Sequence, residues 1–172
     1  MKIEELSIKG VFLIKPNVFN DNRGYLYESY NSNRWSSLNF PNEFVQDNVA
    51  YNSKKNTIRG MHYQEKYYQA KLVSCIRGSI IDVVVDIRKD SDTFKQWLSV
   101  NLSDKNKGFA HGYRTLEDNT IVYYKTDQYY MPKDYRGFIW NDRNININWG
   151  DDLPDDIILS DKDKEYREFK HE

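Results

Sequence analysis

Short apolar runs rich in β-branched and aromatic residues recur along the chain, and polar or glycine-containing segments separate them. The spacing is roughly ten residues, which is typical of strands joined by tight turns. The strongest run is 80–88, an almost unbroken series of Ile and Val. Strands are therefore predicted at 10–15, 25–30, 44–51, 71–76, 80–88, 97–102 and 119–126.

Helical signals are confined to two places. Residues 34–38 have room for one or two helical turns before Pro41, and Ser160 is a suitable N-cap for a short helix near the C-terminus. Amphipathic helices are otherwise scarce, and no repeat or linker interrupts the chain. The pattern predicts an all-β sandwich or barrel that forms one domain over residues 1–172.

Charge and cysteine content narrow the function classes. The 25 Lys and Arg nearly balance the 26 Asp and Glu, so the net charge of −1 gives no electrostatic reason to expect a nucleic-acid partner. No stretch of 18 apolar residues is present, and the first residues lack the apolar core of a secretory signal. A single cysteine, Cys75, excludes an internal disulfide. We expect a cytoplasmic protein, because that compartment keeps thiols reduced.

Aromatic residues are unusually frequent. Fourteen Tyr, eight Phe and four Trp make up 15% of the chain. Tyrosine and tryptophan suit strands and pocket walls, where one end of the ring is apolar and the other meets water. The composition therefore fits either a β-rich core or a cavity that stacks planar ligand groups.

The densest group of candidate catalytic residues is the segment 59–64, which holds Arg59, His62 and Gln64. An imidazole titrates near neutral pH, so His62 is a candidate general base if a carboxylate orients it. The alternative is a satisfied histidine in the core. His111 lies in a similar glycine-containing segment. With so few histidines and no His-x-His pair, we expect neither a metal site nor a cofactor.

Lys71 opens an apolar strand, so it lies either at the rim of the sheet or inside a cavity. Pointing inward, its cation could stabilise a developing oxyanion. Together with Arg23 and Arg59 it could bind an anion such as a diphosphate, although ordinary surface charge is the alternative for each of the three. The chain has no glycine-rich phosphate loop, so side chains would have to hold any nucleotide.

Eight segments, spread in order over nearly the whole chain, match motifs of one family. They are Phe19-x-Asp21-x-Arg23-Gly24 with Glu28, Gln46-Asp47-Asn48, 59–64, Gln69-x-Lys71-Leu72-Val73, 78–88 in the form GxxxDVxxDxR, 108–113, Trp140-Asn141-Asp142 and Leu159-Ser160-x-x-Asp163. The sequence resembles the dTDP-4-dehydrorhamnose 3,5-epimerases, dTDP-sugar epimerases of the cupin superfamily. Each motif alone is weak, but eight in order are specific.

The resemblance implies a cupin jelly roll, also called a double-stranded β-helix, without a metal. It implies a homodimer that exchanges N-terminal strands. The implied substrate is a nucleotide-linked 4-keto-6-deoxyhexose, and the reaction inverts C3 and C5 by removing and returning a proton at each carbon. The C4 ketone makes both protons acidic, because the resulting carbanion is an enolate.

The resemblance also assigns roles. His62 looks like the base, Asp163 its orienting carboxylate, Lys71 the cation beside the C4 oxygen, and Tyr124 the acid on the opposite face. Residues 159–163 would then fold back over the pocket. The residues expected to bind the substrate are Arg23, Glu28, Gln46, Asp47, Asn48, Arg59, His111, Tyr130 and Lys162.

The sequence departs from the family pattern at three places, of which the first two lie in the presumed substrate or nucleotide region. Leu26 stands where the family often has an aromatic residue for base stacking, and Tyr135 stands where a Glu is expected. In addition, Lys107 joins directly to Gly108, where the family normally has about a strand's worth of residues ending in Ile-Pro. A strand is not lost without leaving its neighbours unpaired. We expect either a different closure of the barrel or, preferably, a segment omitted from this chain.

Two other functions stay open at this point. One is an epimerase acting on a single carbon, or on a GDP- or CDP-linked sugar. The other is a non-catalytic cupin that binds sugar nucleotides. Binding alone requires no base, no orienting carboxylate and no acid, so the set His62, Asp163, Lys71 and Tyr124 favours an enzyme.

Overall fold

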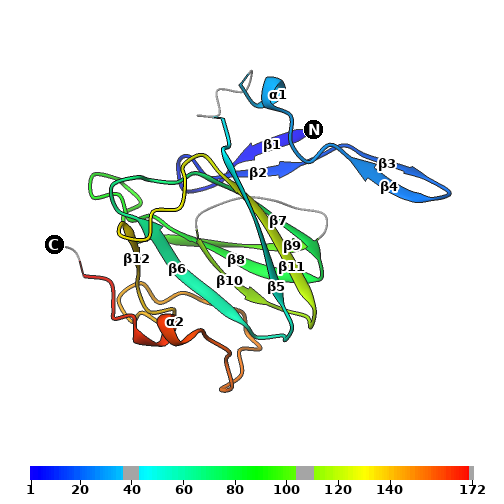
Figure 1. Cartoon of the computed structure of the whole chain (residues 1–172). Helices are drawn as coiled ribbons and strands as arrows, with labels where there is room; N and C mark the ends of the chain where they lie inside the picture. Colours follow the sequence, from blue (N-terminus) through cyan, green and yellow to red (C-terminus); the bar gives the residue numbers. More distant parts are fainter. Residues whose placement is uncertain (37–42, 104–110, 171–172) are drawn as a thin grey trace.

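The structure is a computed structural model that describes residues 1–36, 43–103 and 111–170, and Figure 1 shows its two facing sheets and projecting hairpin. The strands are β1 (Lys2–Glu5), β2 (Phe12–Lys15), β3 (Val18–Asp21), β4 (Gly24–Tyr27), β5 (Gln46–Asn52), β6 (Ile58–Gln64), β7 (Lys71–Arg77), β8 (Ser79–Val85), β9 (Trp97–Ser103), β10 (His111–Thr115), β11 (Thr120–Thr126) and β12 (Tyr135–Gly137). The helices are α1 (Ser32–Ser36) and α2 (Asp161–Glu165).

Two antiparallel sheets form the body. One has five strands in the order β12-β6-β10-β8-β9, and the other has three in the order β5-β11-β7. The chain crosses between the sheets after β5, β6, β7, β10 and β11. The predicted all-β class and short C-terminal helix are confirmed. The repeated crossing gives the double-stranded β-helix that the resemblance implied.

The space between the sheets is apolar at one end and polar at the other. Its apolar end is a cluster of Val73, Cys75, Ile80, Leu102, Tyr113 and Val122. Two positions further along the same strands, and therefore on the same face, stand Lys71, Asp82, His111 and Tyr124. Strand alternation thus places four polar side chains at one mouth of the barrel.

The outer face of the five-stranded sheet is also covered. Ile58, Met61, Ile81 and Val83 pack there against the C-terminal segment, which contributes Phe138, Ile145, Ile147 and Trp149. This second apolar cluster holds residues 138–149 against β6 and β8, from which the chain continues to α2.

A β-bulge lies where β6 meets β10. His62 pairs with His111, but Arg59 pairs with Tyr113, so Gly60 and Met61 stand opposite the single residue Gly112. A Cβ atom built on Gly60, whose φ is +133°, would lie 2.5 Å from the Gly112 Cα. The close approach therefore requires glycine at position 60, and the atoms that it approaches belong to the backbone of Gly112.

The bulge changes which side chains share a face. Without it, alternation would put Ile58 and Met61 on opposite sides of the sheet, because they are three positions apart. With the extra residue both enter the outer apolar cluster. Met61 and His62 still lie on opposite faces, and Arg59 and His62 both face the interior.

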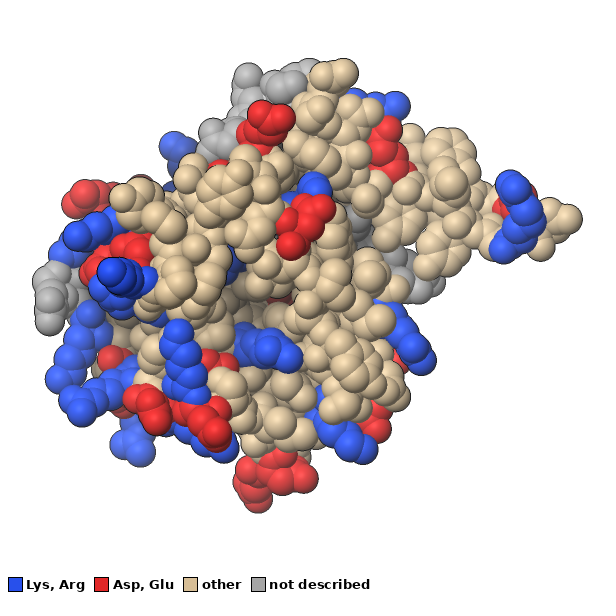
Figure 2. Space-filling model, in the orientation of Figure 1, with Lys and Arg blue, Asp and Glu red and all other residues tan. Residues whose placement is uncertain are grey.

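The N-terminal hairpin β3–β4 projects from the body (Figure 1). Its residues are exposed, including Phe19 at 63% and Leu26 at 70%. A cavity of about 250 Å³ lies at its base, lined by Met1, Pro16, Asn17, Phe19, Leu26, Glu28 and Arg34. On the face shown in Figure 2, positive and negative side chains are interspersed over the body.

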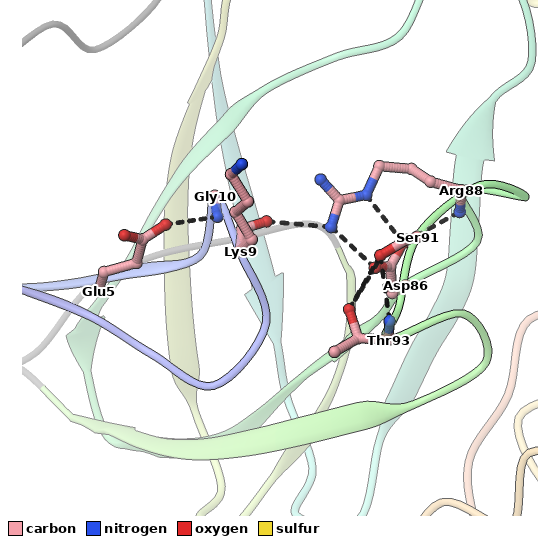
Figure 3. A network of polar contacts seen from close by, with 7 residues as sticks. All are labelled: Glu5, Lys9, Gly10, Asp86, Arg88, Ser91 and Thr93. Atoms are coloured by element: carbon pink, nitrogen blue, oxygen red, sulfur yellow. Dashed lines mark hydrogen bonds and ion pairs between the residues drawn. The ribbon is translucent and has the colours of Figure 1, made fainter.

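The strand predicted at 80–88 ends earlier, at Val85, because Asp86 turns the chain (Figure 3). The Asp86 carboxylate accepts hydrogen bonds from Arg88, Ser91 and Thr93, at 2.6–3.0 Å. Burial acts to raise its pKa, but these hydrogen bonds outweigh burial and hold the pKa below its usual value. Arg88 also donates to the Lys9 carbonyl, which ties this loop to the N-terminal segment.

Five strands were not among those predicted: β1, β3, β6, β10 and β12. Apart from β6, which has seven residues, each has three to five residues and depends on a paired neighbour rather than on a long apolar run. The expected gap before Gly108 falls at 104–110, outside the described residues.

Candidate active site

His62 and Asp163 form the shortest polar contact at the barrel mouth. The His62 Nε2 lies 2.6 Å from Oδ1 of Asp163. A carboxylate at Nε2 holds the ring proton there, which leaves Nδ1 with its lone pair. The side chains are 17% and 4% exposed, respectively. The pair therefore combines a shielded carboxylate with an imidazole that is still accessible.

Helix α2 delivers this carboxylate from the other end of the chain. Ser160 caps it by accepting a hydrogen bond from the Asp163 backbone N–H, as the sequence predicted. Just upstream, Ile158 exchanges backbone hydrogen bonds with Asn56 and Ile58. The C-terminal segment is thus pinned to the start of β6, so that it folds back over the pocket.

A second set of charged groups is buried deeper in the barrel. His111 Nε2 lies 3.6 Å from Oδ1 of Asp82, too far for a hydrogen bond, and neither atom has a hydrogen-bond partner in the described part of the chain. Burial lowers the pKa of Lys71 to about 8, although the nearby Asp82 opposes that shift. At pH 7 the lysine is still mostly protonated.

Burial perturbs the other two members of this set as well. It raises the pKa of Asp82 well above its usual value, with Lys71 acting in the opposite direction. Burial also lowers the pKa of His111 well below 6.5, helped by the charge of Lys71 and by His62. His111 is therefore a neutral imidazole at pH 7, with a poor capacity to accept a proton.

A cavity of about 240 Å³ opens between these groups and the solvent. It is lined by Gln46, Asn48, Gln69, Lys71, Tyr124, Thr126, Tyr130 and Tyr135. His62 adjoins this lining through Tyr135, whose ring centroid is 5.2 Å from that of His62. Buried Asn48 Nδ2 has no hydrogen-bond partner among the described residues, so it is a free donor.

Three further predicted residues lie at or near this cavity. Gln46 bonds both the Asn48 side chain, at 2.8 Å, and the Tyr130 backbone N–H, at 2.9 Å. Arg59 donates to the Asn52 side chain at 2.9 Å, and its charge acts on Tyr113 and Tyr124. Burial raises the pKa of Tyr124, with Arg59 opposing, so this phenol keeps its proton at pH 7.

Three predicted substrate contacts lie away from the cavity. Arg23 is at the turn of the hairpin, paired with Asp21, and its side chain is 85% exposed. Glu28 pairs with Arg34 beside the hairpin cavity. Asp47 pairs with Lys125 on the outer face of its sheet, because alternation along β5 turns it away from Gln46 and Asn48.

Sequence reasoning missed Asp82, Tyr135, Gln69 and Thr126 as residues of the site. For Asp82 a signal was present, since an acid inside an otherwise apolar strand, two positions from Ile80, must face the same interior. For Tyr135 the only signal was its departure from the expected Glu. Lys162 lies on the outer side of Tyr135, with its Nζ 4.5 Å from the ring centroid.

Fold and site together define a jelly-roll protein with acid–base side chains gathered at one barrel mouth. The sequence model of the dTDP-4-dehydrorhamnose 3,5-epimerase family matches residues 5–171, and the chain belongs to that family. A dTDP-4-dehydrorhamnose 3,5-epimerase of Shigella flexneri is 43% identical over 178 aligned positions, covering 98% of this chain and 96% of the relative. Since 178 exceeds the chain's 172 residues, that relative carries residues that this chain lacks.

Solved structures agree over the full fold. The dTDP-4-dehydrorhamnose 3,5-epimerase of Bacillus anthracis, with TDP and PPi bound, superposes with a TM-score of 0.91 at 41% identity, covering 98% of this chain and 99% of that one. The dTDP-6-deoxy-D-glucose-3,5-epimerase of Legionella pneumophila, in complex with dTDP-4-keto-L-rhamnose, gives 0.90 at 36% identity, covering 97% and 92%.

Proposed function

We propose that this protein is an isomerase that inverts C3 and C5 of dTDP-4-dehydro-6-deoxy-D-glucose to give dTDP-4-dehydro-L-rhamnose, a step of deoxysugar synthesis for surface polysaccharide. One observation carries the proposal. A cavity lined by the buried ammonium of Lys71 and the protonated phenol of Tyr124 adjoins, through Tyr135, the imidazole of His62, which Asp163 orients. Proton transfer at a carbon next to a ketone needs these three kinds of group.

The chemistry follows from these positions. The free Nδ1 of His62 takes the proton from C3, and the electron pair moves into an enolate whose negative C4 oxygen lies beside Lys71. Tyr124 then gives its phenolic proton to the opposite face of C3. The same two transfers repeat at C5. Imidazolium and phenolate each exchange protons with water between the transfers, which restores both groups.

Substrate binding divides between two parts of the protein. Gln46, Asn48, Arg59, His111 and Tyr130 hold the sugar and its diphosphate at the cavity. We propose that Arg23 and Glu28 reach the nucleotide of a partner chain, in a homodimer formed through the projecting hairpin. The exposed apolar hairpin supports this arrangement, because Phe19 is 63% and Leu26 is 70% exposed among the residues that the structure describes.

The remaining expectations fit this proposal. The whole of residues 1–172 acts as one catalytic domain, without a cofactor and without nucleic acid. Among the residues that the structure describes, no helix has the length and apolar character needed to cross a membrane. Cys75, the single cysteine of the sequence, is a buried thiol, which supports a reducing compartment such as the cytoplasm.

The proposal is tested by incubating the protein with dTDP-4-dehydro-6-deoxy-D-glucose in D2O and locating deuterium by NMR. We expect label at both C3 and C5, because the phenolic proton comes from solvent. Label at one carbon alone would indicate a single-carbon epimerase. Intact nucleotide binding without any label would leave only a binding protein.

His62→Ala supplies the matching variant. It removes the base but none of the proposed diphosphate contacts, so exchange should be abolished while dTDP affinity stays nearly unchanged. Retained exchange would refute the role of His62. Two measurements test the dimer. Analytical sedimentation should give twice the mass of one chain. Arg23→Ala should raise KM with little change in kcat, because Arg23 is proposed to contact the nucleotide.

A further inference from the structure

His62 packs against two tyrosines that have no assigned role. The Tyr135 ring centroid is 5.2 Å from that of His62 with the planes tilted by 44°, and the Tyr166 ring centroid is 5.8 Å away with the planes at 61°. The two rings come from different parts of the chain, because Tyr135 opens β12 and Tyr166 follows α2 as its C-cap. Both rings therefore contact the imidazole.

The same two tyrosines also link helix α2 to strand β12. Lys162, on the helix, places its ammonium 4.5 Å from the centroid of the Tyr135 ring, within the range of a cation–π contact. Tyr166, which follows the helix, packs so closely on Gly137 that a Cβ atom there would lie 2.5 Å from its ring. Tyr135 and Gly137 lie on the same face of β12. Strand β12 pairs with β6, and Gly137 is the residue opposite His62.

Helix α2 needs such external support. It has five residues, and a helix of that length does not persist on its own in water. Asp163, however, must stay within 2.6 Å of His62 to fix its tautomer. The position of the carboxylate therefore depends on whatever holds the helix, and the contacts nearest to His62 are those of Tyr135 and Tyr166.

We propose that Tyr135 and Tyr166 are positioning residues: they pack against His62 and hold helix α2 in place, so that Asp163 keeps the proton on Nε2 and leaves Nδ1 free as the base. The inference rests on the proposed function only for its kinetic consequence. Neither phenol competes for the proton, because burial raises the pKa of both, to about 12 for Tyr166. The rings act by shape and by the cation–π contact rather than by acid–base chemistry.

The test reads the tautomer of His62 directly. In protein labelled with ¹⁵N-histidine, the two ring nitrogens have different shifts according to which one bears the proton, and no substrate is needed. The variants are Tyr135→Leu and Tyr166→Leu, which remove a ring, and Tyr135→Phe and Tyr166→Phe, which keep it. Tyr68→Leu is the matched control, because Tyr68 is 73% exposed. His111 serves as an internal reference within each spectrum.

We expect the leucine variants to lose the Nε2–H preference of His62, as Asp163→Asn should, and the phenylalanine variants to keep it. Turnover at saturating substrate should fall about tenfold or more in the leucine variants with KM changed less than about threefold, and Tyr68→Leu should match the wild type. A wild-type tautomer in the leucine variants would overturn the proposal. A raised KM with unchanged kcat would also overturn it, because the rings would then only contact substrate.

Two further outcomes separate this inference from the proposed function. If no variant turns over the sugar, wild type included, the proposed function fails, while the tautomer measurement still decides the positioning role. If a leucine variant does not fold, Lys162→Met replaces it, since this change removes only an exposed cation. We expect a smaller shift of the tautomer in the same direction, and an unchanged tautomer would refute the seating of the helix through Tyr135.

Discussion

The barrel contains two histidine–aspartate pairs, and they differ in nearly every physical property. His62 and Asp163 are 2.6 Å apart, and the imidazole is partly exposed. His111 and Asp82 are 3.6 Å apart and fully enclosed beside Lys71. Burial and the lysine lower the pKa of His111, whereas His62 has a carboxylate 2.6 Å from its Nε2 that orients the ring. Proximity of the two residue types is thus insufficient, and solvent access with a tight contact distinguishes the base.

The largest effect should come from breaking the first pair. Asp163→Asn keeps the shape of the side chain but presents either an amide N–H or an uncharged oxygen to Nε2. The orientation of the ring proton is lost, so kcat should fall by about 10³- to 10⁴-fold, the larger figure being the loss when a triad aspartate is changed to asparagine. Steady-state kinetics measure this fall. A loss of less than about tenfold would show that Asp163 does not orient the base.

The second prediction concerns the pH dependence of activity, which tests the buried group formed by Lys71, Asp82 and His111. The pKa of Lys71 is lowered to about 8, so the cation that we propose stabilises the enolate disappears as pH rises through that value. We expect kcat/KM to fall about tenfold per pH unit above about pH 8. A pH–rate profile at constant ionic strength measures this limb. A flat profile up to pH 10 would remove Lys71 from the mechanism.

Stability should respond to the same titration with the opposite sign. The folded pKa of Lys71 lies below its unfolded value of 10.5, so the unfolded chain binds more protons between about pH 8 and 10. The lysine therefore makes the free energy of unfolding rise with pH in that window. Urea unfolding at pH 8 and pH 9 should show a larger rise for the wild type than for Lys71→Met, which lacks the titration.

A smaller loss of activity is expected when the buried His111 is substituted. His111→Asn keeps a polar group at the barrel mouth but shortens the side chain, so substrate contacts weaken while the base stays intact. We expect kcat/KM to fall about tenfold, mostly through KM. If His111→Asn instead matched the effect of Asp163→Asn on kcat, the assignment of the base to His62 would be wrong.

The smallest effect should follow Asp82→Asn. The negative charge of Asp82 favours the charged form of Lys71, and its removal lowers the lysine pKa further. The alkaline limb should move to lower pH, with a loss of only a few-fold at pH 7. A limb that moves to higher pH would contradict this electrostatic coupling.

The sequence predicted the long strands well, because alternation and β-branched runs are local properties. It also placed Ser160 as a helix cap from one residue type and its position. The short strands escaped because pairing creates them: Tyr135–Gly137 is extended only where β6 lies beside it. The Ile80–Val85 segment was recognised as a strand, but the role of Asp82 required knowing that Lys71 and His111 face the same cavity.

The site was predicted in part from the family resemblance rather than from local sequence patterns. Nothing local connects His62 to Asp163, and only the resemblance to a family joined them in advance. Asp47 shows the limit of that approach, because a motif match places it beside Gln46 and Asn48 although alternation turns its side chain to the opposite face. Motifs therefore identify segments, while strand geometry decides which residues of a segment reach the cavity.

The bulge at Gly60 and Met61 has a consequence for how this sequence can vary. The extra residue shifts the alternation of side chains by one position, so Arg59 and His62 lie on one face although they are three positions apart. Deleting a single residue there would leave Arg59 and His62 two positions apart, and regular alternation would still place both side chains on the interior face. The face that each residue occupies therefore depends on the spacing and the bulge together, because the bulge removes one residue of this segment from the alternation.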